Sequence, residues 1–409
     1  MVFRRAKSEL EGRGAVWTEE RGSLRVSDEA CLSQRGAPPS GLTSEAARNE
    51  RPSEEGRRRV KAPRRRAISI DIHAHVAPAG LITDLAAGRV RFLHVEVRRQ
   101  DGRHTVAFRG GPPTRPLAAG LTDPGLRAAW LTEQGIARQV VSGWLDIFGY
   151  ELPAGEGADW SVALTEAIAA LTAADGRLIP LGTVPLQDPE RAAAALHQRP
   201  VAQIPGVMIG TRAGGRELDD PAFTPFWEAA DAAGAVVYLH PGSAGATPRY
   251  ADFGLVNGLA RLEDSTVTLA RLLYAGVPAR YPGAKLVVAH GGGALPYVLG
   301  RLVRNHLIDP GGTADPVESF ARLHFDSVVF DPAVLEFLVA KAGPDRVMLG
   351  SDYPFPIGDL APRSVVERAA LPDAHRGQIL GGNAARLFGA AAVAPAAHPG
   401  PPPPRETAR

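Results

Sequence analysis

Five residues of metal-binding or acid–base type end apolar stretches of this sequence. They are His73, His75, His240, His290 and Asp352. His73 and His75 are two residues apart on an expected strand, so their side chains point to the same face. Two neighbouring imidazoles form half of a metal site. The pattern predicts a metal centre if the fold brings the other three residues to the same place.

An alternation of strands and helices supplies such a fold. The expected strands are 68–75, 138–144, 178–185, 205–210, 235–240, 285–290, 323–330 and 347–351. Asp-Pro pairs at 123–124, 188–189, 220–221 and 331–332 are typical helix starts, with Asp as the cap and Pro in the first turn. Eight such units predict a (β/α)8 TIM-like barrel, in which the carboxyl ends of all strands form one ring.

Three segments fall outside the barrel pattern. An insertion at about residues 80–122 contains a β-hairpin, 90–97 with 104–108, around an Asp-Gly turn. Residues 1–66 form a basic tail and residues 393–409 a Pro-rich tail, both expected to be disordered. A second interpretation of the first tail is that translation starts at Val60. Under either interpretation, residues 67–392 are expected to form the barrel domain.

The residue types narrow the metal chemistry. We expect His73, His75, His240 and Asp352 to bind the metal. The sequence has four lysines, at positions 7, 61, 285 and 341, and none follows an expected strand end, so none can bridge two metals as a carbamate. The site should hold one ion. Three imidazoles and one carboxylate suit Zn²⁺, with Mn²⁺ and Fe²⁺ as alternatives. His290 is left as the acid/base catalyst.

Composition excludes several other functions. Residues 1–67 carry a net charge of +6 and the remaining residues carry −4, so the globular part offers no basic surface for nucleic acid. No apolar run reaches the roughly 18 residues of a membrane span. Cys31 is the single cysteine, which fits a cytoplasmic protein without disulfides. We expect no cofactor besides the metal.

Several motifs resemble the amidohydrolase superfamily. They are His73-x-His75, His240-Pro241 and the segments 289–293 (AHGGG), 350–356 (GSDYPFP) and 379–384 (ILGGNA). They are most similar to its aminocarboxymuconate-semialdehyde decarboxylase branch, over roughly residues 68–389. The resemblance implies a distorted barrel, one divalent metal on the same four ligands, His290 as the catalytic histidine, and a homodimer.

The resemblance also implies how a substrate is held. Arg301 corresponds to an arginine that reaches the substrate carboxylate across the dimer interface. A second substrate arginine lies in the insertion, where Arg109 and Arg115 are candidates. Trp144 and Phe355 follow strand ends and could stack on a flat substrate, although core packing explains them equally well. A structural ion pair in a dimer is the alternative for Arg301.

These observations predict a metal-dependent decarboxylase. Its substrate is a small unsaturated or aromatic carboxylic acid, and metal-bound water with His290 performs the acid/base steps, with Asp352 counted among the catalytic residues. A hydrolase of a lactone or amide could use the same residues and is the alternative. A metal-binding protein without turnover is the third interpretation.

Overall fold

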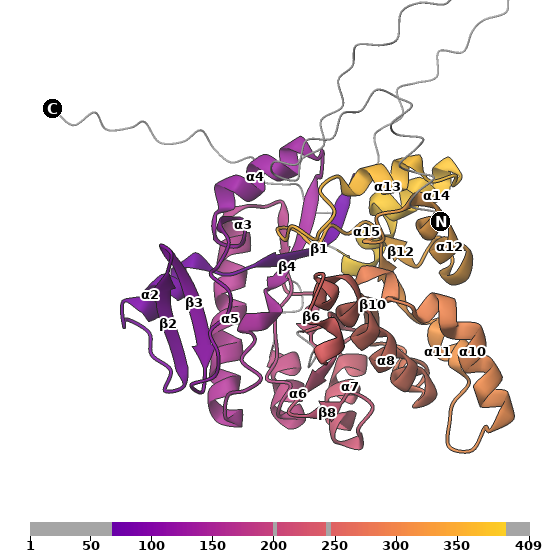
Figure 1. Cartoon of the computed structure of the whole chain (residues 1–409), viewed down its shortest axis with the longest axis horizontal. Coiled ribbons are helices and arrows are strands. Elements are labelled where there is room, and N and C mark those ends of the chain that lie inside the picture. Colours follow the sequence, from indigo (N-terminus) through magenta and orange to yellow (C-terminus); the bar gives the residue numbers. More distant parts are fainter. Residues whose placement is uncertain (1–67, 199–202, 243–246, 390–409) are drawn as a thin grey trace, which may run out of the picture. The chain divides into compact units, whose positions relative to one another are not determined.

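Eight parallel strands form a closed barrel at the centre of the chain. Helices surround the strands (Figure 1). The computed structural model describes residues 68–198, 203–242 and 247–389, and the two predicted tails lie outside these ranges. The barrel strands are β1 (Ile70–Val76), β4 (Arg138–Gly143), β5 (Leu178–Pro180), β6 (Gly206–Ile209), β9 (Val236–Leu239), β10 (Lys285–Val288), β11 (His324–Asp326) and β12 (Val347–Met348).

Two isolated bridges close the barrel. Strands β1, β4 and β5 form one parallel ladder, and β6, β9, β10, β11 and β12 form the other. Gly182, after β5, pairs with Val207 of β6, and Ala74 of β1 pairs with Tyr353 beyond β12. The backbone N–H of Ile72 also donates to the carbonyl of Leu349 at 2.8 Å. Each strand therefore has two neighbours, as a TIM barrel requires.

The longer helices pack around the barrel and bury its outer face, except α2, which packs against the strand β2 (Val95–Gln100) and against α5 (Figure 1). They are α2 (Ala79–Ala86), α4 (Pro124–Glu133), α5 (Ala154–Ala174), α6 (Pro189–Gln198), α7 (Thr224–Ala232), α8 (Arg261–Tyr274), α10 (Leu295–Ile308), α12 (Pro332–Ala342) and α13 (Pro362–Arg368). Shorter helices are α3 (Ala119–Thr122), α9 (Val277–Arg280), α11 (Pro316–Phe320), α14 (Asp373–Gly377) and α15 (Asn383–Phe388).

Single turns of other helix types complete the connections. They are η1 (Leu145–Ile147), η2 (Pro221–Phe223), η3 (Pro248–Tyr250), η4 (Val256–Ala260), η5 (His290–Gly292) and η6 (Gln378–Gly382).

The Asp-Pro pairs start helices as predicted. Asp123 and Asp331 accept hydrogen bonds from backbone N–H groups in the first turns of α4 and α12. Asp220 caps η2, which leads directly into α7, and α6 begins at Pro189. These caps satisfy N–H groups that otherwise lack partners.

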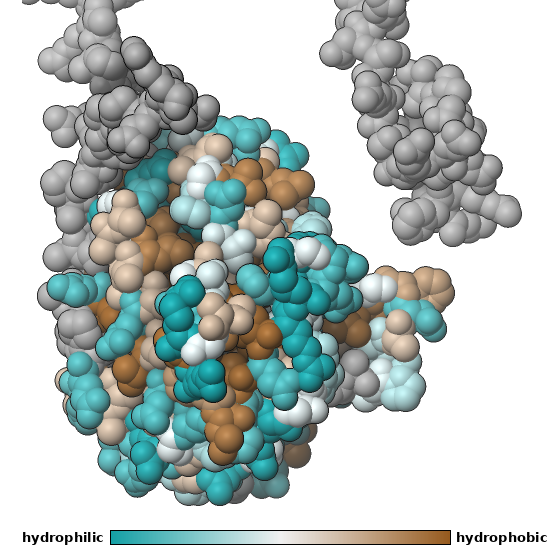
Figure 2. All heavy atoms as spheres, turned by 90° about the vertical axis from the view of Figure 1, so that its left-hand side faces the viewer, coloured by the Kyte–Doolittle hydropathy of each residue, from teal (hydrophilic) through white to brown (hydrophobic). Residues whose placement is uncertain are grey.

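The segment between β1 and β4 contains an antiparallel strand pair. Strands β2 (Val95–Gln100) and β3 (Arg103–Phe108) pair around Asp101-Gly102, both of which have positive φ angles, at 50° and 77°. Phe108 packs 5.7 Å, between ring centroids, from the fully buried Trp160 of α5. Nδ1 of His94 lies 2.6 Å from Oε2 of Glu156 on α5, within hydrogen-bond distance. These contacts hold the strands β2 and β3 against α5. On this side of the chain, hydrophilic and hydrophobic patches alternate over the surface (Figure 2).

The strands lie where the sequence predicts them, but several are shorter. The expected strand 323–330 ends at Asp326, and the expected strand 178–185 ends at Pro180. Two residue pairs, β7 (Arg212–Ala213) and β8 (Arg216–Glu217), form a small antiparallel ladder that the sequence analysis missed. Within the described residues, no helix has both the length and the apolar character needed to cross a membrane.

Candidate active site

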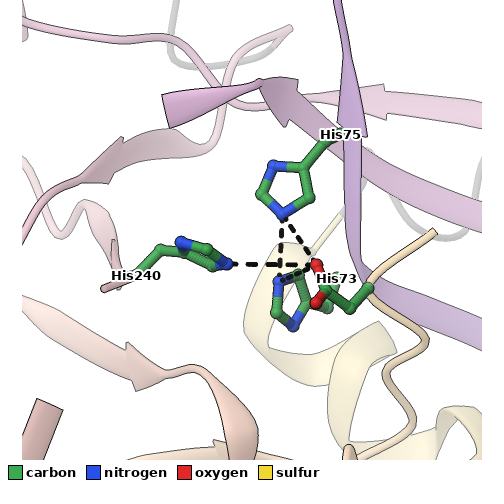
Figure 3. A group of neighbouring side chains, drawn as sticks. His73, His75 and His240 are labelled. Carbon is green, nitrogen blue, oxygen red and sulfur yellow. Dashed lines mark hydrogen bonds and ion pairs between the residues drawn. The ribbon is translucent and has the colours of Figure 1, made fainter. Parts of the chain in front are cut away.

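Three histidines and one aspartate meet at the carboxyl ends of β1, β9 and β12 (Figure 3). The Nε2 atoms of His73 and His75 are 3.2 Å apart. Oδ1 of Asp352 lies 3.3 Å from Nε2 of His73 and 3.1 Å from Nε2 of His75. Nε2 of His240 lies 4.0 Å from the same oxygen. The four ligand atoms are all within 4.8 Å of one another, so the predicted residues do come together.

Backbone contacts between β1 and the segment after β12 hold this cluster. The N–H of Asp352 donates to the carbonyl of His73, and the N–H of His75 donates to the carbonyl of Tyr353, both at 2.8 Å. Asp352 has a left-handed backbone, with φ of 60°, which turns its carboxylate back toward the histidines. Two segments almost 280 residues apart in sequence are therefore joined at the ligands themselves.

Burial and charge set the protonation of these residues. All four are buried, with side chains at most 7% exposed. Burial lowers the pKa of His75 below its ordinary value and that of His240 well below it, so both are neutral at pH 7. Burial also acts to lower the pKa of His73, but the charge of Asp352 and the hydrogen bond to Asp326 outweigh it and raise the pKa to about 10.

The donor set fits a single divalent cation. Ligand atoms at 2.0–2.1 Å from Zn²⁺ in a tetrahedron are about 3.3 Å apart, which matches the spacing of His73, His75 and Asp352. Neither ring nitrogen of His240 has a hydrogen-bond partner in the described part of the chain, although both are buried. Buried polar atoms rarely stay without partners, and a cation would provide one for Nε2. The structure thus contains a metal-binding site of three histidines and one aspartate.

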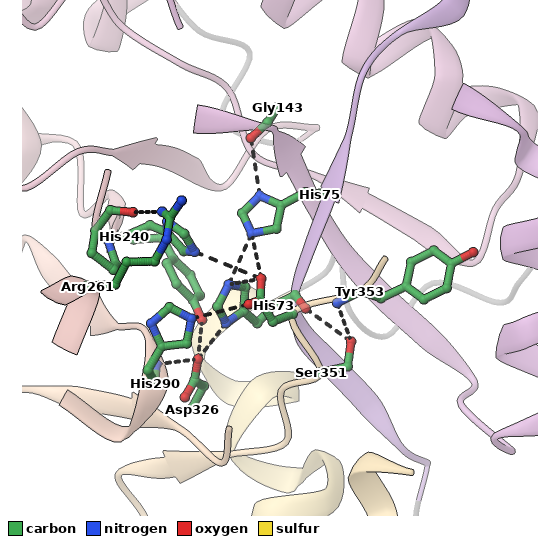
Figure 4. A network of polar contacts seen from close by, with 12 residues as sticks. His73, His75, Gly143, His240, Arg261, His290, Asp326, Ser351 and Tyr353 are labelled. Carbon is green, nitrogen blue, oxygen red and sulfur yellow. Dashed lines mark hydrogen bonds and ion pairs between the residues drawn. The ribbon is translucent and has the colours of Figure 1, made fainter. Parts of the chain in front are cut away.

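A second layer of buried polar residues supports the ligands (Figure 4). Asp326, the last residue of β11, faces Nδ1 of His73 at 2.6 Å and accepts a hydrogen bond from the hydroxyl of Tyr238 at 3.0 Å. Burial acts to raise the pKa of Asp326, but the hydrogen bond and charge of His73 hold it below its ordinary value. A carboxylate on one ring nitrogen leaves Nε2 free for a metal.

The carboxylate of Asp71 anchors the strand that carries His73 and His75. It accepts hydrogen bonds from the N–H of His73 at 3.0 Å, from Gln139 at 2.8 Å and from Ser351 at 2.6 Å. Sequence reasoning missed both Asp71 and Asp326. The signal was present, because each is an ionisable residue inside a short apolar strand, where a carboxylate needs several partners.

His290 stands beside the ligand cluster without belonging to it. Its Nε2 lies 3.4 Å from Oδ2 of Asp352, and its ring centroid lies 5.1 Å from that of His240. The side chain is 11% exposed, and Nδ1 has no hydrogen-bond partner within the described residues. An imidazole in this place can take up or release a proton next to anything bound at the cluster.

Aromatic side chains form one wall of the site. Phe355 lies 5.2 Å from the ring of His75 and 6.0 Å from the ring of Trp144, between centroids. The guanidinium of Arg115 lies over Trp144, 5.5 Å from the ring centroid. Arg109 instead donates to the backbone carbonyl of Glu151. Of the two insertion arginines, Arg115 is therefore the one that faces this wall.

Arg301 and the two described lysines lie away from the ligand cluster. Arg301 is exposed on α10. Lys285 is the first residue of β10, at the opposite end of the strand from the ligands, and Lys341 lies on α12 against Phe337. Neither described lysine can reach the ligand cluster.

Comparison with known proteins places this site in context. A family model described as amidohydrolase matches residues 70–390. A 2-amino-3-carboxymuconate-6-semialdehyde decarboxylase from Dictyostelium discoideum is 28% identical, covering 79% of this chain and 92% of that protein. The crystal structure of 5-carboxyvanillate decarboxylase from Sphingomonas paucimobilis is 25% identical, with a TM-score of 0.65, covering 79% of this chain and 99% of that one.

A further structure of the same fold contains a metal. It is a 5-carboxyvanillate decarboxylase from Novosphingobium aromaticivorans, complexed with manganese, with 20% identity and a TM-score of 0.61. It covers 78% of this chain and 96% of that one.

Proposed function

The chain belongs to the amidohydrolase family, and from this premise we propose that it is a metal-dependent, non-oxidative decarboxylase of a small unsaturated or aromatic carboxylic acid. The observation that carries the proposal is the four-residue ligand cluster with His290 free beside it and an aromatic wall next to it. The decarboxylase named among the relatives covers most of the chain, which favours this reaction over hydrolysis.

One divalent metal would be held by His73, His75, His240 and Asp352. When bound, it supplies positive charge that attracts substrate oxygens and stabilises negative charge developing on them. Zn²⁺ suits three imidazoles and one carboxylate, with Mn²⁺ and Fe²⁺ as the alternatives. Metal analysis of the purified protein distinguishes them, and one equivalent per chain is expected.

His290 would supply the proton. In decarboxylation the bond between the carboxylate and its carbon breaks, carbon dioxide leaves, and the carbon keeps the electron pair and must gain a proton. The imidazole of His290 lies beside the ligand cluster, where that carbon would be held, and its Nδ1 has no hydrogen-bond partner within the described residues. Proton transfer by a positioned side chain contributes about 10²–10⁴-fold in rate. Asp352 keeps the Nε2 side of the His290 ring oriented.

The substrate would be held by stacking and by arginine. Phe355 is partly exposed and offers an apolar ring face to a flat molecule, and Trp144, which is 4% exposed, lies beside it. Arg115 lies over Trp144, where it can pair with a substrate carboxylate. Substituting Arg115 by Ala should raise KM more than it lowers kcat, because the carboxylate contact forms when substrate binds.

Arg301 would complete the site from a second subunit. It is exposed on α10, one turn after Tyr297, whose side chain is 82% exposed. In the homodimer we propose, α10 of one subunit faces the site of the other. Mixing the inactive variants Arg301→Ala and His290→Ala would then restore activity, to about a quarter of wild type if subunits pair at random. A mixture that stays inactive, or a monomeric protein, contradicts this arrangement.

A substrate screen tests the reaction itself. Metal-loaded protein is incubated with a panel of aromatic and unsaturated carboxylic acids, lactones and amides, and carbon dioxide release is followed. We expect an acid to release carbon dioxide, and we expect His290→Ala to lower the rate of release by a factor of about 10² or more. His197→Ala, a substitution on the exposed face of α6, is the matched control and should keep wild-type turnover. Turnover of lactones or amides alone would instead establish a hydrolase.

A further inference from the structure

Asp326 makes more polar contacts than its place at the end of a short strand requires. Its Oδ2 faces Nδ1 of His73 at 2.6 Å and accepts from the hydroxyl of Tyr238 at 3.0 Å. Its Oδ1 accepts from the backbone N–H of Val328 at 3.1 Å. The residue is completely buried, at 0% exposure.

The remaining two contacts of the Asp326 carboxylate are with the backbone of His290, the proposed proton donor, and of Gly291. The backbone N–H of His290 donates to Oδ2 of Asp326, and the backbone N–H of Gly291 donates to Oδ1, both at 2.9 Å. A carboxylate accepts about four hydrogen bonds through two oxygens. With five donors around it, this carboxylate is fully used, and it connects a metal ligand to the acid/base residue (Figure 4).

The backbone at His290 needs such a partner. His290 and Gly291 have φ angles of 55° and 60°, a left-handed conformation that side-chain-bearing residues seldom adopt. In a tight turn of this kind, successive backbone N–H groups can form a concave site for an anion. Here that anion is the carboxylate of Asp326, so the turn that directs the His290 ring toward the ligand cluster forms around it.

We propose that Asp326 is the positioning residue that sets the orientation of His73 for the metal and, through the backbone, the place of His290 for proton transfer. The effect on turnover rests on the proposed decarboxylase function. The effect on metal binding does not depend on that function, because it concerns only which ring nitrogen His73 presents to the metal.

Asp326→Asn is the sharpest substitution. The amide has nearly the same shape, but only one of its two polar atoms accepts hydrogen bonds. Whichever way it turns, its NH₂ group faces N–H or O–H donors, either at His73, Tyr238 and His290 or at Gly291 and Val328. In the first orientation the contacts to His73 and to the N–H of His290 are lost together, and in the second the contact to the N–H of Gly291 is lost. The side-chain volume does not change.

Asp71→Asn is the matched control. Asp71 is also a fully buried carboxylate near the same ligand, and it accepts three hydrogen bonds. It contacts His73 only through the backbone N–H, so it does not touch the imidazole. A general loss of buried hydrogen bonds would affect both variants, whereas a positioning role predicts a difference between them.

The test measures metal affinity by competition with a chelator, together with kcat and KM at saturating metal. Second-layer partners of metal ligands are worth about 10–100-fold in metal affinity or activity, and we expect losses of this size in both quantities for Asp326→Asn. KM should stay close to wild type, because Asp326 does not reach the substrate. Asp71→Asn should lose less metal affinity than Asp326→Asn, because it removes no contact to the imidazole of His73, even if it unfolds at a lower temperature. Equal metal affinity in wild type and Asp326→Asn would overturn the proposal, as would equal losses in both variants.

Nuclear magnetic resonance of the wild-type protein covers the case in which Asp326→Asn does not fold. In protein loaded with Zn²⁺, Nδ1 of His73 should carry a slowly exchanging proton at strongly downfield shift, as its short contact to Asp326 requires. A His73 ring with its proton on Nε2, or an Nδ1 proton that exchanges like one in solvent, contradicts the proposal. If metal affinity depends on Asp326 while no acid is decarboxylated, the positioning role stands and the proposed reaction is wrong.

Discussion

His324 should make the stability of this protein depend on acid. The residue begins β11, and its Nε2 lies 3.3 Å from the guanidinium of Arg346. Burial and the charge of Arg346 lower the pKa of His324 from 6.5 to about 4. Between these two values the unfolded chain binds a proton on this residue that the folded protein does not bind. The free energy of unfolding therefore falls as the pH falls from about 6.5 to about 4.

The size of the effect follows from the pKa difference. Each pKa unit corresponds to about 1.4 kcal/mol, so a shift from 6.5 to about 4 costs about 3 kcal/mol over the whole interval. Above pH 6.5 His324 is neutral in both states and its contribution is complete. His324→Gln cannot take up the proton, so its stability should fall by about 3 kcal/mol less than that of wild type between pH 7 and pH 4.

Urea unfolding of metal-free protein at several pH values measures this difference. Excess chelator keeps metal release from contributing, and all other titrating groups cancel when the two proteins are compared. His197→Gln is the control, because that side chain is exposed on α6, and its curve should run parallel to wild type. If His324→Gln also runs parallel to wild type, the reasoning about burial and Arg346 is wrong.

Three further changes have distinct expected outcomes. Gly206→Ala would place its Cβ 1.9 Å from the carbonyl oxygen of Val236, so the free energy of unfolding, measured by thermal unfolding, should fall by about 2–4 kcal/mol. Gly80→Ala is the control and should change it little, because a Cβ there meets no atom within 4 Å. Phe355→Ala should raise KM about tenfold with a smaller change in kcat, because it removes stacking area next to His75. Metal at about 1,000 times its Kd should stabilise wild type by about 4 kcal/mol in thermal unfolding, and this gain should be largely lost in His240→Ala.

The barrel and its ligand ring could be predicted because both follow from local patterns. Apolar runs that end in His or Asp mark strands whose last residues leave the core, and parallel strands bring those ends together. His73, His240 and Asp352 could therefore be assigned to one cluster from sequence alone. The short ladder of β7 and β8 could not, because two-residue strands around Gly214 and Gly215 carry no periodic signal.

The buried layer behind the ligands was missed for a different reason. A single Asp at the end of a run is ordinarily taken as the start of a loop, and the expected strand 323–330 continued through Asp326. In the structure the strand ends at this residue because its carboxylate binds the N–H of Val328 and groups from three other segments. Such a role depends on contacts between segments distant in sequence. Arg301 shows the same limit, because it is exposed on α10 and its proposed role depends on a second subunit.

The most direct test of metal-dependent decarboxylation is a titration of metal into chelator-stripped protein while carbon dioxide release is followed. With an accepted acid from the substrate screen, the rate should rise in proportion to added metal and level off at one equivalent per chain, because one cluster of four ligands is available. A rate that is independent of metal, or one that rises until two equivalents are bound, would contradict the account.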